Sequence, residues 1–296
     1  TGMSGFKYTN PGGFVQRDGR EYVITRRTRA DADMATDDAK QSDVVLLLRH
    51  GPRLLIDTDE AILTADKERG IGYEDPRLLS DGSAFTLTLV TESGYRSWLV
   101  ELHKGYRGRR MYPIGPRGSV SKNGYLFTSR SGKTIVVSRM CETRAIQFYA
   151  FDTLAQAEMF CQEDLPLEAW QRYQVGSVGT PEWSEGDKGR FHHAGFGTMV
   201  APNVAVVHFA RANESGKYYV TALQQIDDGG VPVGPPQLIA EPADNLPHGD
   251  VPNVIYTMMA WVEGSELVLW SGHDDTNIVE CRTKLPKWAV VEIARR

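Results

Sequence analysis

The chain has 296 residues, 41% of them hydrophobic and 24% charged, a composition typical of a globular protein that buries a large core. The net charge of -5 and the scattered Lys and Arg residues give no basic footprint, so we expect no nucleic-acid partner. No run of about 18 apolar residues could span a membrane, and no apolar signal core follows the first charged residue, so no membrane contact is expected.

The three cysteines are odd in number and widely spaced along the chain, at Cys141, Cys161 and Cys281. This pattern fits a reducing compartment better than a disulfide framework or a thiolate metal site. We therefore predict a cytoplasmic protein, and the sequence leaves open whether it forms a homo-oligomer.

Five hairpins with a common plan recur along the chain. Each has a short polar or Gly/Pro-containing motif, an apolar strand, a turn and a second apolar strand. The opening motifs are Asn10-Pro11-Gly12-Gly13, Glu74-Asp75-Pro76-Arg77, Lys122-Asn123-Gly124, His192-His193-Ala194-Gly195 and Asp250-Val251-Pro252-Asn253. The turns are Asp18-Gly19, Asp81-Gly82, Ser131-Gly132, Pro202-Asn203 and Glu263-Gly264. Such turns between apolar runs are strong hairpin signals.

Further strand-like runs separate the hairpins, at 44–48, 98–102 and 218–223. Together they predict an all-β fold, a five-bladed β-propeller with about four strands per blade. Length alone allows one domain or two, but the repeat favours a single domain over residues 1–296. A run at 155–160 with little β-branching, capped by Asp152, predicts a short helical insertion between blades three and four.

The repeat also predicts a site. The innermost strand of each blade lines the propeller channel, so the residues at the entrances of these strands converge at one mouth. We expect Asn10, Asp75, Asn123, His193 and Asp250 to lie around that mouth.

The second motif carries the most chemistry. Pro76 is expected to hold Asp75 in extended backbone at the strand entrance. A carboxyl group beside a second carboxylate can retain its proton near neutral pH, while the neighbouring Arg77 can keep the other ionised. The alternative for Glu74, Asp75 and Arg77 is a capped turn held by a surface ion pair.

The hairpin entrances resemble those of glycoside hydrolase family 130, the inverting β-mannoside phosphorylases and their hydrolase relatives. The resemblance covers nearly the whole chain. Its most specific motifs are Asn10-Pro11-Gly12, Glu74-Asp75-Pro76-Arg77, Lys122-Asn123-Gly124-Tyr125-Leu126-Phe127, Gly249-Asp250-Val251-Pro252-Asn253-Val254 and Gly272-His273-Asp274-Asp275-Thr276.

The resemblance implies that Asp75 is the general acid and that it acts through a sugar hydroxyl. It also implies a sugar subsite formed by Asn10, Arg26 and Asp275, and a phosphate or acceptor site near Lys122, Asn123 and Arg139. The residues expected to bind substrate are Asn10, Arg26, Glu74, Arg77, Asp250 and Asp275. Alternatively, Arg26 belongs to a solvated rim and Asp275 to a simple turn.

The chain departs from the family in the fourth blade. Phosphorylases usually carry a lysine before a Gly-Pro-Pro segment there, and a histidine near the end of the returning strand. Here the first place reads 190–197, Arg-Phe-His-His-Ala-Gly-Phe-Gly, and the second reads His208-Phe209-Ala210. Arg190, His192 and His193 are candidate phosphate ligands in a rearranged anion site. Alternatively, one histidine packs inward and the other is solvated, and the anion site is lost.

We expect no metal and no cofactor, because the His and Asp spacing fits no metal motif; inorganic phosphate would be a co-substrate. The predicted function is cleavage or formation of β-mannosidic bonds with inversion, by phosphorolysis of a mannoside or oligosaccharide. The alternatives are a β-mannoside hydrolase, with Glu74, Asp250 or Asp274 as base, a sugar-nucleotide-dependent mannosyltransferase, and a non-catalytic sugar-binding propeller.

Overall fold

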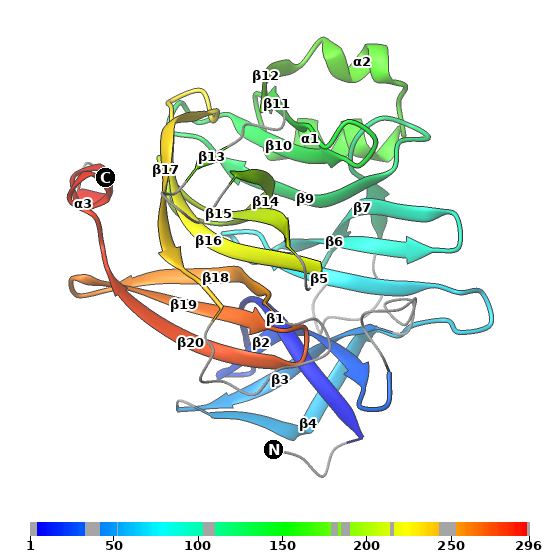
Figure 1. Ribbon diagram of the computed structural model, residues 1–296. Coiled ribbons are helices and arrows are strands. Elements are labelled where there is room, and N and C mark those ends of the chain that lie inside the picture. The colour runs from blue at the N-terminus through cyan, green and yellow to red at the C-terminus, as the bar shows by residue number, and fades with distance from the viewer. Residues whose placement is uncertain are drawn as a thin grey trace.

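Five antiparallel sheets follow one another along the chain and form the blades of a β-propeller in this computed structural model (Figure 1). The structure describes residues 5–32, 42–51, 53–102, 110–178, 183–184, 190–213, 216–242 and 253–294. Within these ranges the side chains at 56–58, 183–184, 190, 212–213 and 216–217 are not described. The predicted five-bladed, all-β fold is confirmed.

The first three blades have four strands each, in the order of the chain. Blade 1 contains β1 (Phe6–Arg17), β2 (Arg20–Arg29), β3 (Asp43–His50) and β4 (Arg53–Leu63). Blade 2 contains β5 (Gly72–Leu78), β6 (Ala84–Thr91), β7 (Gly94–Glu101) and β8 (Met111–Pro113). Blade 3 contains β9 (Ser121–Thr128), β10 (Thr134–Met140), β11 (Ile146–Phe151) and β12 (Gln174–Val178).

The last two blades depart from this plan. Blade 4 contains β13 (Trp183–Ser184), β14 (Arg190–Ala201), β15 (Val204–Asn213), β16 (Gly216–Ile226) and β17 (Pro232–Ala240). Blade 5 contains β18 (Ile255–Glu263), β19 (Glu266–His273) and β20 (Asn277–Lys284). Within the described ranges, blade 4 therefore has an extra short strand beside β14, and blade 5 has three strands. All five predicted hairpins are present.

The predicted helical insertion is confirmed ahead of blade 4. It consists of α1 (Leu154–Gln162) and α2 (Leu167–Gln171), which lie between β11 and β12. The cap of α1 is Thr153 and not Asp152 as expected, because the Thr153 hydroxyl accepts the Gln156 N–H at 3.1 Å. A third helix that the sequence analysis missed, α3 (Lys287–Ala294), follows blade 5. No helix in the described ranges has the length and apolarity needed to cross a bilayer.

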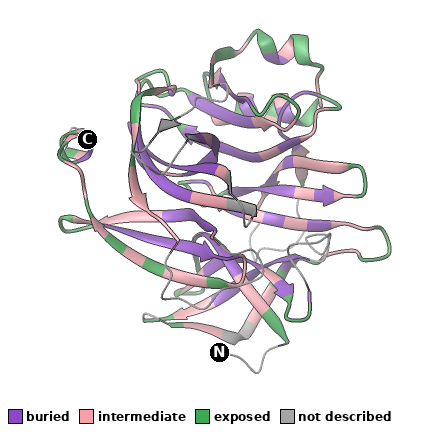
Figure 2. Ribbon diagram, viewed as in Figure 1, coloured by how far each residue is buried: buried purple, intermediate pink, exposed green. Residues whose placement is uncertain are grey.

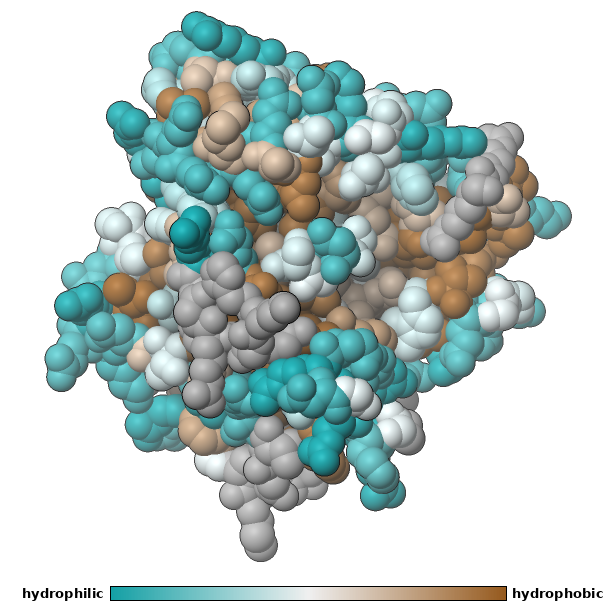
Figure 3. Space-filling view, turned by 180° about the vertical axis from the view of Figure 1, so that it is seen from behind, coloured by the Kyte–Doolittle hydropathy of each residue, from teal (hydrophilic) through white to brown (hydrophobic). Residues whose placement is uncertain are grey.

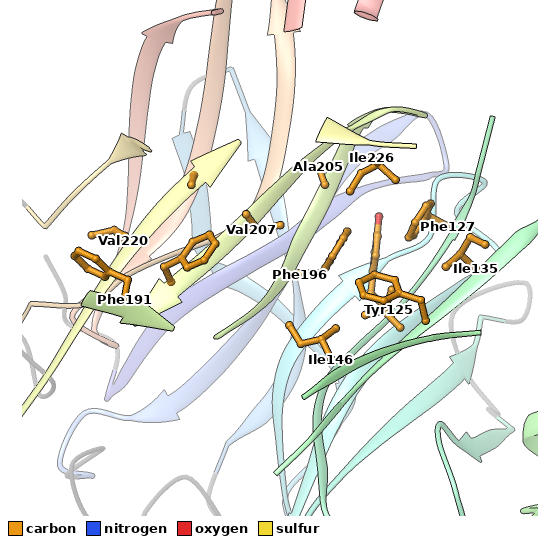
Figure 4. Close-up of a cluster of buried hydrophobic side chains, with 14 residues drawn as sticks. Tyr125, Phe127, Ile135, Ile146, Phe191, Phe196, Ala205, Val207, Val220 and Ile226 are labelled. Atoms are coloured by element: carbon orange, nitrogen blue, oxygen red, sulfur yellow. The ribbon is translucent and has the colours of Figure 1, made fainter. Parts of the chain in front are cut away.

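Each seam between neighbouring blades has its own apolar cluster. Phe127 and Ile135 of blade 3 face Phe196 and Val207 of blade 4 across one seam (Figure 4). Other clusters join blades 2 and 3, blades 1 and 2, and blades 4 and 5 with α3. The ring closes where Val23 of blade 1 packs with blade 5. Removal of apolar surface from water at these seams stabilises the ring.

Alternation along the strands explains how one blade supplies two seams. In β2, Val23 packs toward blade 5, whereas its neighbour Ile24 packs toward blade 2. Successive side chains of a strand point to opposite faces, so a blade that is buried on both faces needs apolar residues at consecutive positions. Buried residues accordingly concentrate in the middle of the sheets and exposed ones at their ends (Figure 2). Seen from behind, hydrophilic residues cover most of the rim (Figure 3).

Candidate functional site

Three inner strands carry the same backbone irregularity at corresponding positions. Asn10, Asp75 and Asn123 have positive φ angles of 54°, 53° and 56°. The pairing register shifts at each of these places, between Thr9 and Gly13 in β1, between Glu74 and Arg77 in β5, and at 122–125 in β9. Bulges of this kind redirect a side chain. Asn and Asp tolerate the left-handed region better than other residues with side chains.

The expected conformation of Asp75 is wrong. Proline at position 76 was expected to keep Asp75 in extended backbone at a strand entrance, but Asp75 lies inside β5 with a φ of 53°. The bulge accounts for the difference, because it requires a left-handed residue and Pro76 excludes only the right-handed helical region. Asp75 retains 14% exposure of its side chain.

The motif residues of four blades meet through hydrogen bonds. Asn10 Nδ2 donates to Asp75 Oδ1 at 2.7 Å, joining β1 to β5. Arg77 Nη2 donates to Asn123 Oδ1 at 3.2 Å, joining β5 to β9. Asn123 Nδ2 in turn donates to the carbonyl of Ala194 in β14 at 2.9 Å. The predicted convergence of Asn10, Asp75 and Asn123 is therefore present in the geometry.

Arg77 lies beneath this cluster and is fully buried, with 0% side-chain exposure. Its Nη1 donates to the Asp75 carbonyl at 3.0 Å and its Nη2 to the Tyr256 hydroxyl at 2.9 Å. Its Nη2 is 4.0 Å from Asp75 Oδ2. A buried guanidinium with these partners can orient Asp75 from below, whereas direct contact with substrate, the role expected from sequence, would require exposure.

Glu74 is a buried carboxylate shared by two cations. Arg26 Nη2 lies 3.3 Å from its Oε1, and Lys122 Nζ lies 3.3 Å from its Oε2. Arg26 is itself 3% exposed, so it is not part of a solvated rim. Glu74 thus joins blade 1 to blade 3 and is not the surface ion pair of the alternative interpretation.

Asp275 lies beside the same arginine, with its Oδ1 3.9 Å from Arg26 Nη1. Burial raises the pKa of Asp275, Arg26 lowers it, and the nearby carboxylates of Asp75 and Glu74 raise it further, so that the net shift is upward. Asp275 and its neighbour Asp274 both have positive φ angles, 54° and 51°, in the turn between β19 and β20. The turn interpretation is thus correct for the backbone, and the side chain still faces the Glu74 and Asp75 cluster.

Arg139 of β10 is paired with Lys122 of β9 across the strands of blade 3. Its Nε is buried and has no hydrogen-bond partner among the described residues. Burial lowers the pKa of His192 and His193 and raises that of Tyr256; the charge of Arg139 adds to the first two shifts and opposes the third. Tyr256 also feels the charge of Asp75, so Arg139 and Asp75 lie within electrostatic reach of one hydroxyl.

The two adjacent histidines of blade 4 differ in surroundings. His193 is 1% exposed and packs against the rings of Phe209 and Phe196, at centroid distances of 4.9 and 6.1 Å. Burial, with Arg139 and His192, lowers the pKa of His193 to about 3, so its ring is neutral at pH 7. His192 is half-buried, and burial and Arg139 lower its pKa as well. The His193 ring therefore carries no charge and packs with the apolar residues of the seam between blades 3 and 4, away from the expected anion site.

Two predicted site residues fall at the edges of the described ranges. Asp250 lies outside the described residues, and so does the side chain of Arg190 at the start of β14. His208, noted in the fourth blade, is fully buried. Its Nε2 accepts the Thr257 N–H at 2.8 Å, and its ring stacks on Tyr256 at 3.8 Å.

The sequence analysis missed two tyrosines of the site. Tyr256 in β18 accepts the Arg77 hydrogen bond, and the ring of Tyr95 in β7 lies 3.6 Å from Lys122 Nζ. Tyr256 follows the fifth motif by only three residues, a spacing that could have flagged it. Tyr95 has no such signal because β7 is a third strand and not an inner one. Among the described residues, no group of three or more His, Cys, Asp or Glu could hold a metal ion.

Comparison of the sequence with models of protein families and with curated proteins finds no match. Comparison of the structure with solved structures finds proteins of the same fold. A mannose phosphorylase from Leishmania mexicana, in complex with phosphate ion, matches with a TM-score of 0.65 and 15% identity, over 98% of this chain and 87% of that chain.

Two further solved structures match to a similar degree. A β-1,2-mannobiose phosphorylase from Listeria innocua, in complex with β-1,2-mannobiose, has a TM-score of 0.64 and 15% identity, over 100% of this chain and 95% of that chain. A GDP-Man-dependent mannosyltransferase from Leishmania mexicana has a TM-score of 0.64 and 15% identity, over 97% and 87%. The resemblance seen in the sequence is thereby confirmed for the fold, which phosphorylases share with a transferase.

Proposed function

We propose that this protein is a carbohydrate-active enzyme that cleaves or forms β-mannosidic bonds with inversion, using inorganic phosphate as nucleophile. The fold shared with mannose and mannobiose phosphorylases supports the substrate class. The choice of phosphorolysis over the other reactions of the fold rests on the charges at the site.

The observation that carries the proposal is the state of Arg139. Arg26 and Lys122 are both paired with Glu74, and Arg77 is buried under Asp75. Arg139 has no carboxylate partner among the described residues, and its buried Nε has no acceptor. A guanidinium left in this state, on the residue paired with Lys122, is suited to an oxyanion that arrives with the substrate.

A hydrolase would need a carboxylate base in place of phosphate. Glu74 has a cation on each oxygen, which weakens it as a base. Asp274 is 0% exposed, and its Oδ1 accepts the Val254 N–H at 3.0 Å. The third base considered for a hydrolase, Asp250, lies outside the described residues.

The proposed reaction has one displacement. A phosphate oxygen, held by Arg139 with Lys122 and Asn123, attacks the anomeric carbon as the bond to the leaving oxygen breaks on the opposite face. Asp75 gives its proton to a sugar hydroxyl, and that hydroxyl gives its own proton to the leaving oxygen. The products are α-mannose 1-phosphate and the shortened sugar, and Asp75 remains as a carboxylate.

The test is an assay of β-mannobioses of different linkage with and without phosphate. We expect release of mannose 1-phosphate that depends on phosphate, with no free mannose formed from the donor sugar. Equal release of free mannose in both conditions would favour the hydrolase. Activity only with a sugar nucleotide would favour the mannosyltransferase, and binding without turnover would leave a sugar-binding propeller.

A further inference from the structure

The ammonium group of Lys122 lies between a carboxylate and an aromatic ring. Its Nζ is 3.3 Å from Glu74 Oε2 and 3.6 Å from the centroid of the Tyr95 ring. The ring belongs to blade 2 and the lysine to blade 3, so the contact crosses a seam between blades.

Glu74 alone does not fix this lysine. Lys122 carries four rotatable bonds, its contact with Glu74 is long for a charged hydrogen bond, and Arg26 shares the same carboxylate. A second contact on another side of the ammonium is needed to hold one position. The face of an aromatic ring provides it, because the π electrons attract a cation without forming an ion pair with it.

The position of Tyr95 is itself well determined. It pairs with Val90 in the hairpin of β6 and β7 and follows Gly94, which has a φ of 123°. A Cβ on Gly94 would lie 3.5 Å from Val120 Cγ1, so the turn rests on the chain just ahead of β9. The hairpin therefore sets the ring at a fixed place relative to the strand that carries Lys122.

We propose that Tyr95 is a positioning residue that holds the Lys122 ammonium partly away from Glu74, with N–H groups free for the phosphate. This inference rests on the proposed function. Without the ring, the ammonium would settle onto Glu74 as a closer ion pair, and the anion site would lose one of its donors. Tyr95 acts through Lys122 and does not touch the reacting atoms.

The charged groups around Lys122 are consistent with this role. They are the carboxylates of Glu74, Asp75 and Asp275 and the guanidinium groups of Arg26 and Arg139. Burial alone would lower the pKa of Lys122, but Glu74, Tyr95 and Asp75 together raise it above its ordinary value. The ammonium therefore stays charged at neutral pH.

The kinetic test compares Tyr95→Leu, which removes the ring, with Tyr95→Phe, which keeps it. We expect Tyr95→Leu to raise the KM for phosphate by about five- to thirty-fold with kcat changed by less than about two-fold. In the separate variant Tyr95→Phe, the KM for phosphate should stay within about two-fold of that of the original protein. An unchanged phosphate KM in Tyr95→Leu, with phosphorolysis intact, would overturn the proposal.

A second readout does not require turnover. Lysines labelled with ¹³C and ¹⁵N are titrated by NMR, with Lys122→Met to assign the resonance. Tyr95→Leu should change the chemical shift of Lys122 at neutral pH, and Tyr95→Phe should not; the pKa of Lys122 falls in both variants, because both lose the ionisable phenol. Tyr95→Met replaces Tyr95→Leu if the latter does not fold. Should the protein show no phosphorolysis, the proposed function fails, and an unchanged Lys122 resonance in the ring-less variants would separately refute the positioning role.

Discussion

Asn10 Nδ2 donates a 2.7 Å hydrogen bond to Asp75 Oδ1 across the boundary between blades 1 and 2. Both residues have left-handed backbone, each produced by a bulge in an inner strand. The amide fixes one oxygen of the carboxyl group, and the other is 4.0 Å from Arg77. The orientation of the proposed acid thus depends on Asn10 of the neighbouring blade as well as on Arg77 of its own strand.

Gly272→Ala tests this dependence. A Cβ at Gly272 would lie 1.8 Å from Asn10 Oδ1, so Asn10 must move and its bond to Asp75 is lost. We expect turnover to fall by at least about ten-fold, since misplacement of a catalytic group by about 1 Å can cost two orders of magnitude. Gly5→Ala is the matched control, because nothing lies within 4 Å of its Cβ. Similar turnover in the two variants, measured on a β-mannoside, would show that the contact is unimportant.

Arg77→Met should destabilise the protein more than the substitution of a charged residue on the surface does. The substitution leaves the Asp75 carbonyl, Asn123 Oδ1 and the Tyr256 hydroxyl without their donor. Removal of one partner from a buried charged network costs about 3 to 5 kcal/mol in the free energy of unfolding, measured by urea denaturation. Tyr256→Phe removes only one of these bonds and should cost about 0.5 to 1.5 kcal/mol. Equal effects of the two variants would contradict the network.

His193 should make stability fall in acid. Its pKa is about 3 in the folded protein and near its ordinary value of 6.5 in the unfolded chain, so the unfolded state binds the proton first. The contribution of His193 to the free energy of unfolding is fully present above about pH 6.5. It decreases toward pH 3 by roughly 1.4 kcal/mol per pH unit. His193→Phe should reduce this slope between pH 6 and pH 4 in urea denaturation. His208 is also buried with a lowered pKa, so part of the slope should remain. If the slope of the variant equals that of the original protein, His193 does not contribute to the pH dependence of stability in this range.

The repeat of five hairpins could be predicted from the sequence because turns and apolar strands are local signals. Asn10, Asp75 and Asn123 could be aligned on it because each occupies the bulge of an inner strand. His193 was assigned to the site by the same alignment, but the bulge of β14 falls between His193 and Gly195, and the ring turns into the seam between blades 3 and 4. The side-chain direction depends on register, which the motif does not specify.

The roles of the basic residues were harder to predict from sequence. Arg77 is charged and lies two residues after Asp75, which indicates substrate contact, yet it is 0% exposed. Tyr95 lies in a third strand and reaches Lys122 only because neighbouring blades pack face to face. Contacts across a seam depend on the packing of two sheets and leave no periodic signal in either.

Asp75→Asn tests the acid. We expect turnover of a β-mannoside with a poor leaving group to fall by a factor of about 10² to 10⁴, because the amide keeps the shape but has no carboxyl proton. Sugar affinity by calorimetry should stay within a few-fold, and thermal unfolding should show an intact fold. A substrate with a good leaving group needs no proton and should lose much less. Normal turnover of the poor-leaving-group substrate would mean that Asp75 is a structural residue of the bulge.

The most direct measurement follows the first product by ³¹P and ¹H NMR during the reaction of a β-mannobiose with phosphate. The account predicts α-mannose 1-phosphate as the first product, because phosphate attacks the face opposite to the leaving oxygen. Its rate of formation should rise with phosphate concentration and saturate. Appearance of β-mannose 1-phosphate, or of free mannose at a rate independent of phosphate, would contradict it.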